Sequence, residues 1–141
     1  MKMWLVALTA IVAAVAAGTG YYAATARADA RLQDCGDWVD ETNQRVQVAR
    51  TLLYPSDRSE AFEGSPLQAA EELVALFDEQ ANSSPPEGAG QLNDDLLEAM
   101  SDGAIGLEGQ GAAAPETLIV FAKAIIYTAD ARLLAVSTTL C

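Results

Sequence analysis

Residues 29–53, DARLQDCGDWVDETNQRVQVARTLL, carry the pattern that decides the fold. Apolar and small residues recur there at alternating spacings of three and four, which keeps them on one face of an α-helix. No proline interrupts the segment, and Gly36 is its single glycine. The pattern predicts an amphipathic helix from about Asp29 to Leu53. Its apolar face consists of Leu32, Cys35, Val39, Thr42, Val46, Ala49 and Leu53.

The next helix has the clearest start signal in the chain. Ser65 is a preferred N-cap residue, Pro66 suits the first helical position, and Gln68 lies where a capping box requires it. The spacing that follows predicts a helix from Pro66 to about Ala81. Its expected apolar face contains Leu67, Ala70, Val74, Phe77 and Ala81, widened by Leu73 and Leu76.

Two further helices are predicted towards the C-terminus. A weaker one covers about residues 91–101, and Asp102-Gly103 is expected to stop it, with the later glycines as a mobile connection. The last runs from about Pro115 to about Thr138 and is apolar around much of its circumference. Its charged residues make a membrane span unfavourable. We expect it to be buried in the domain, and coverage by another chain is the alternative.

These four segments predict an all-α fold. Residues 29–141 should form an up-down-up-down antiparallel four-helix bundle, because the connections of about 9–13 residues join antiparallel neighbours. No segment shows the period-two alternation of a β-strand.

The two cysteines test this topology. Cys35 lies near the start of the first bundle helix, and Cys141 follows the last one. An even number of antiparallel helices brings both residues to the same end of the bundle. We therefore predict a Cys35–Cys141 disulfide in an oxidising compartment. Two unpaired thiols, or a bond from Cys141 to a partner, are the alternatives.

The N-terminal sequence is typical of a segment that enters a membrane. Residues 3–26 contain no charged residue, and a helix of that length spans about 36 Å, enough for the hydrocarbon layer. Trp4, Tyr21 and Tyr22 lie where an aromatic belt would place them. Residues 1–28 are thus expected to be a membrane anchor or a signal segment.

A cleavable signal peptide is the alternative. Trp4–Ala17 would be its apolar region and Ala26-Arg27-Ala28 its cleavage site. The stretch from Gly18 to Ala28 is long for the region before a cleavage site, so we expect an uncleaved anchor. From Asp29 onward the chain carries 20 acidic and 6 basic residues, and we expect this part to lie outside the cytoplasm, in the periplasm or at the cell surface. Cleavage after Ala28 would give a secreted protein.

The composition excludes several classes of function. The chain has 141 residues, a net charge of −12 and no histidine. Such an acidic chain lacks the basic face that nucleic acids require. Without histidine it lacks the usual general base, zinc ligand and haem ligand. Asp94, Asp95 and Glu98 cluster near a helix start, where acids complement the helix dipole, so we expect neither a metal nor another cofactor.

The sequence therefore favours a non-enzymatic protein that works through contact with another protein. We expect an accessory or structural subunit of a membrane-associated assembly, bound to a protein partner or to further copies of itself. An extracytoplasmic module that binds or senses a small ligand is the alternative. The residues expected to make contacts are Gly18 and Gly20 within the membrane, and Ile119, Val120, Ile126 and Tyr127 on the last helix.

Overall fold

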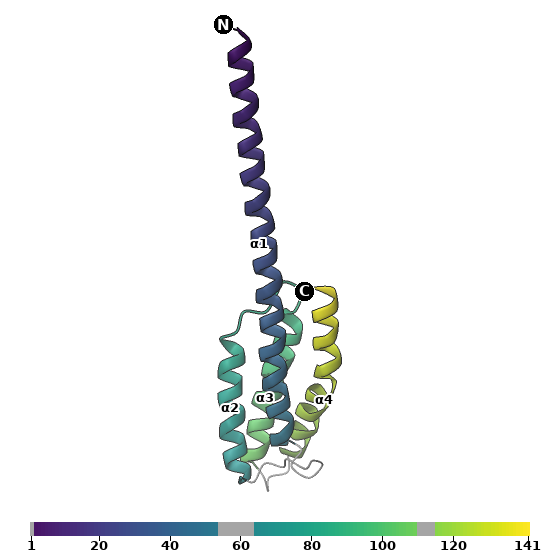
Figure 1. The fold of residues 1–141 in the computed structure, drawn as a ribbon. Helices are drawn as coiled ribbons and strands as arrows, with labels where there is room; N and C mark the ends of the chain where they lie inside the picture. The colour runs from purple at the N-terminus through teal and green to yellow at the C-terminus, as the bar shows by residue number, and fades with distance from the viewer. Residues whose placement is uncertain (1, 54–63, 110–114) are drawn as a thin grey trace. The chain divides into compact units, whose positions relative to one another are not determined.

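The structure is a computed structural model that describes the backbone of residues 2–53, 64–109 and 115–141, and the side chains of residues 24–53, 64–109 and 116–141. Within these residues it contains four α-helices and no strand (Figure 1). The predicted all-α class is confirmed. The helices are α1 (Lys2–Leu53), α2 (Pro66–Ala81), α3 (Gly90–Glu108) and α4 (Pro115–Thr139).

The chain divides into two units, Met1–Asp34 and Cys35–Cys141. In the first unit, α1 provides a helical backbone from Lys2. Within the predicted membrane segment, residues 3–26, the surroundings of residues 3–23 are not described, so the contacts expected of Gly18 and Gly20 stay predictions. Within the described residues, no helix is both long and apolar enough to cross a membrane. The anchor therefore stays a prediction.

In the second unit the four helices form a bundle in which sequence neighbours are antiparallel (Figure 1). Trp38 of α1 bonds to Ser83, whereas Arg45, further along α1, bonds to Gln80, so α1 and α2 run in opposite directions. α3 packs against both α2 and α4. Arg50 joins the end of α1 to Ile126 in the middle of α4, which completes the ring of four helices.

The predicted disulfide is confirmed. Cys35 and Cys141 are bonded, with their Cα atoms 5.5 Å apart. Cys35 lies at the start of the bundle part of α1, and Cys141 follows the end of α4. Both are at one end of the bundle, as an even number of antiparallel helices requires. A structural disulfide indicates an oxidising, extracytoplasmic environment.

The predicted bounds of α2 are confirmed, but its predicted apolar face is wrong in part. The Ser65 hydroxyl accepts from the Gln68 backbone N–H at 3.2 Å, and the Gln68 side chain accepts from the Ser65 backbone N–H at 2.8 Å. Leu67 and Val74, predicted to be buried, are exposed. The helix is rotated relative to the prediction because its buried face includes a polar residue. That face consists of Ala69, Ala70, Leu73, Leu76 and Gln80.

The predicted end of the third helix is also wrong. α3 continues through Gly103 and ends at Glu108. Gly103 is buried where three helices approach: a Cβ atom placed on it would lie 3.0 Å from the Leu53 side chain and 3.2 Å from that of Leu73. Its lack of a side chain allows this close approach, so the glycine serves packing here and does not interrupt the helix.

Two glycine substitutions should therefore have opposite effects. Gly103→Val should lower the free energy of unfolding by about 2 kcal/mol, because added methyl groups overpack a filled site. Gly36→Ala should raise it by about 0.5–1 kcal/mol, because a Cβ at this helical position meets nothing within 4 Å and alanine is the better helix former. Urea unfolding of both variants checks the prediction. A Gly103→Val protein as stable as the parent would contradict the packing described.

Candidate interaction surface on the last helix

The inner face of α4 forms one side of the bundle core. Its residues recur at spacings of four and three and are all buried. Arg50 of α1 donates from Nη2 to the backbone carbonyl of Ile126 at 3.1 Å, which helps to fix α4 against α1. The inner face consists of Ala122, Ile126, Ala129, Leu133 and Val136.

The opposite side of α4 repeats the same spacing at the surface. Val120, Tyr127 and Leu134 follow one another at intervals of seven, with exposed fractions of 66%, 74% and 65%. Small residues that are also exposed follow each of them, four positions further along the helix. We call this set the outer stripe: Val120, Ala124, Tyr127, Ala131, Leu134 and Thr138. It carries no charge.

The hydroxyl groups of Thr128, beside the outer stripe, and Thr138, within it, are turned back onto their own helix. Thr138 donates to the carbonyl of Leu134 at 2.9 Å, and Thr128 donates to the carbonyl of Ile125 at 3.1 Å. Their hydrogens are thus already bonded inside the protein. Burying these groups against a partner costs less than burying unbonded hydroxyls.

Ion pairs within the bundle border the outer stripe. Towards α1, Arg50 Nη1 lies 2.7 Å from an oxygen of Asp130. Towards α3, Arg132 Nη2 lies 2.6 Å from an oxygen of Asp95. These charges are paired inside one molecule and leave a neutral strip between them.

The Asp95 pair also predicts a dependence of stability on pH. Hydrogen bonds from Gln91 and then Arg132 hold the pKa of Asp95 below its ordinary value of 3.8. Because the folded-state pKa is lowered, the stabilisation is present above the unfolded-state value and is lost as the pH falls through the folded-state value.

Asp95→Asn should therefore reduce the melting temperature at neutral pH, and the difference from the parent should shrink as the pH falls below about 4. Asp94→Asn is the matched control, because Asp94 is exposed and lies outside this ion pair. A difference for Asp95→Asn that stays constant with pH would contradict the assignment. Thermal unfolding at several pH values measures it.

The structure separates the four residues predicted to meet a partner. Val120 and Tyr127 lie on the outer stripe, and their contact with a partner stays a prediction. Ile119 is half-buried against the core. Ile126 is fully buried, so its assignment to a partner interface is wrong. Leu134 belongs to the same exposed stripe but was not predicted as a contact; its interval of seven from Tyr127 is the signal that would have found it.

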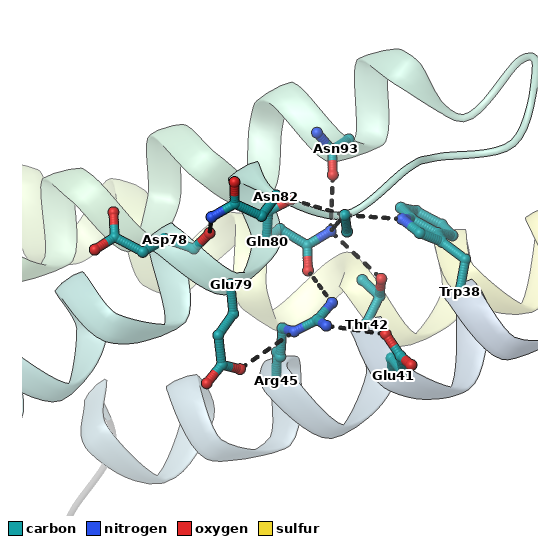
Figure 2. A network of polar contacts seen from close by, with 10 residues as sticks. Trp38, Glu41, Thr42, Arg45, Asp78, Glu79, Gln80, Asn82 and Asn93 are labelled. Carbon is teal, nitrogen blue, oxygen red and sulfur yellow. Dashed lines mark hydrogen bonds and ion pairs between the residues drawn. The ribbon is translucent and has the colours of Figure 1, made fainter.

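A polar cluster centred on Gln80 lies between α1, α2 and α3 (Figure 2). Gln80 is fully buried. Its Nε2 donates to Asn93 Oδ1 at 2.7 Å and lies 3.4 Å from the hydroxyls of Thr42 and Ser83, while its Oε1 accepts from Arg45 at 3.1 Å. Both polar atoms of the Gln80 amide thus have partners within the protein. The role of the cluster is to hold the helices together.

Two hollows on the surface of the protein are candidate ligand sites. One of about 270 Å³ lies between α2 and α3 and is lined by residues that include Val74, Phe77 and Ile105. It is smaller than most ligand pockets. The other, of about 480 Å³, is lined by Gly64, Gln68, Glu71, Glu72 and Ala75. Among the described residues, no group of three acidic or cysteine side chains is placed to hold a metal ion.

Comparison of the chain with protein-family models, curated proteins and solved structures found no significant match.

Proposed function

We propose that this protein is a non-enzymatic subunit of a membrane-associated assembly and that it acts through protein–protein contact. The outer stripe of α4 is the observation that carries the proposal. Three large apolar side chains repeat along one uncharged helix face, on a chain whose net charge is −12. An exposed apolar face of this kind is typical of an interaction site.

The proposed location has two supports. The Cys35–Cys141 disulfide fits an oxidising compartment such as the periplasm or the cell surface. The uncharged residues 3–26 would supply a single membrane-spanning helix, with the bundle outside the cytoplasm. Loss of residues 1–28 by cleavage would instead release the bundle as a secreted protein, and intact mass distinguishes the two forms.

Site-directed photocrosslinking in the native host tests the proposed function. A photoreactive phenylalanine analogue at Tyr127 should give a covalent adduct with a protein, in a membrane fraction that resists extraction at high pH. The same analogue at Val48, an exposed position of α1, should give none. Absence of an adduct at 127, or equal adducts at both positions, would overturn the proposal. A chain that is found wholly in the soluble fraction would overturn the membrane assignment alone.

A further inference from the structure

The acidic residues of the bundle are concentrated away from the outer stripe. Exposed carboxylates lie on α1, α2 and α3, for example Asp40, Glu72 and Glu98. In the described part of α4 the acids are Glu116, in the first turn, and Asp130, which is paired with Arg50. A basic partner would be attracted to the acidic helices. The outer stripe selects its partner by shape, because it offers no charge.

Large and small side chains alternate along the outer stripe. From Val120 to Thr138 the order is Val, Ala, Tyr, Ala, Leu, Thr, at spacings of four and three. Read in the opposite direction, small residues stand where large ones stood. Two antiparallel copies of the stripe therefore place each large side chain opposite a small one. This arrangement allows two helix faces to interdigitate.

We propose that the partner of the outer stripe is the outer stripe of a second copy, packed antiparallel to the first. In this register Tyr127 faces Ala131 of the second copy, Ala124 faces Leu134, and Val120 faces Thr138. A two-fold axis passes at the level of residue 129, so the contact closes and makes a dimer. A parallel pair would instead place Tyr127 on Tyr127 and alanine on alanine, which alternates clashes with gaps.

Charge restricts a second copy to a face that presents few unpaired carboxylates. Two copies that each carry −12 repel one another wherever their acidic helices meet. The outer stripe lets them approach without opposing carboxylates, and the bordering acids Asp130 and Asp95 are already paired with arginines. This inference rests on the proposed function in that it names the protein that covers α4.

The antiparallel pair also sets the direction of the two chains. Cys35, where the chain enters each bundle, lies at opposite ends of the dimer. If the chain is cleaved after Ala28, the pair forms between two free bundles.

The first test measures the mass of the purified full-length protein in mild detergent by light scattering at increasing concentration. The parent should reach the mass of a dimer. Ala131→Glu should weaken the dimer at least about 100-fold, because it places a carboxylate against Tyr127 in an apolar layer. Ile105→Glu adds the same charge at an exposed site on α3 and should leave the dimer intact. A parent that stays monomeric, or an Ala131→Glu dimer as tight as the parent's, would overturn the proposal.

The second test fixes the orientation with introduced cysteines and a short bismaleimide. The two native cysteines are bonded to each other, so only an introduced thiol reacts. A mixture of Val120→Cys and Thr138→Cys chains should cross-link between copies. Val120→Cys alone should not, because the two sites are then about 27 Å apart along the helix. Cross-linking of Val120→Cys with itself would indicate a parallel pair and overturn the proposal.

The outcomes separate this inference from the proposed function. An adduct at position 127 with twice the mass of the chain supports both. An adduct with a different protein, together with a monomeric purified chain, overturns the dimer and leaves the proposed function standing. Absence of any adduct, with a monomeric chain, overturns both.

Discussion

Loss of the Cys35–Cys141 bond should lower the free energy of unfolding by about 4–5 kcal/mol, the largest effect expected of any change at one site. The two residues are 106 positions apart in the sequence. In the chain-entropy model, the cross-link stabilises the folded state by restricting the unfolded chain, and the effect grows with the length of the closed loop. For a domain whose whole stability is about 5–15 kcal/mol, this is a large share.

The measurement is urea unfolding of the Cys35→Ser/Cys141→Ser double variant beside the parent, followed by far-UV circular dichroism. The parent after reduction and alkylation should show nearly the same loss, which separates the bond from the side chains. The helical signal at zero urea should change little, because a stability of about 5–15 kcal/mol exceeds this loss. A loss below about 1 kcal/mol would contradict the model, and would mean that the unfolded chain stays compact without the bond.

The disulfide was predictable because it depended on topology alone. Four antiparallel helices bring the first and last residues of the bundle to the same end. Small errors in the predicted helix lengths do not change this result. The start of α2 was predictable for a similar reason. Ser65, Pro66 and Gln68 act through local hydrogen bonds and a fixed backbone angle, so the surrounding fold has little influence on them.

The orientation of α2 was not predictable, because a polar residue occupies a core position. Gln80 lies on the same face as Leu73 and Leu76 and is fully buried. Because Gln80 is polar, the buried face does not have an unbroken apolar spacing in the sequence. The neighbouring face, which contains Leu67 and Val74, has the more regular apolar spacing. Partners that lie 13 and 35 residues away in the sequence satisfy the glutamine, and a local pattern contains no sign of them.

The contact surface was predicted only in part for a different physical reason. α4 has two apolar stripes on opposite faces, and spacing alone does not say which one the bundle covers. Burial decides it: Ile126 belongs to the covered face, whereas Tyr127, one residue further, belongs to the exposed one. Gly103 shows the same limit, since its close contacts come from α1 and α2 and are set by tertiary packing.

Gln80→Leu should lower the free energy of unfolding by about 3 kcal/mol. Leucine has a similar volume, so the core stays filled, but the buried Asn93 Oδ1 loses the partner it has at 2.7 Å. The partly buried Arg45 Nη1 also loses its bond at 3.1 Å, although Arg45 keeps its ion pairs with glutamates. Each buried polar group left without a partner costs about 1–3 kcal/mol. Gln44→Leu makes the same change at an exposed position of α1 and should alter stability by less than about 0.5 kcal/mol. Urea unfolding of both variants gives the comparison.

A double-mutant cycle distinguishes the cost of an unsatisfied amide from the cost of lost side-chain packing. Asn93→Leu alone should also destabilise the protein, because it leaves the Gln80 amide without its closest acceptor. The Gln80→Leu/Asn93→Leu protein should lose about 1–2 kcal/mol less than the two single losses predict together, since neither group then stays buried without the other. Strict additivity would contradict a shared hydrogen-bond network and would assign the cost of each change to side-chain shape. The cycle thus tests whether the buried amide pair, in addition to the apolar core, holds α2 against α3.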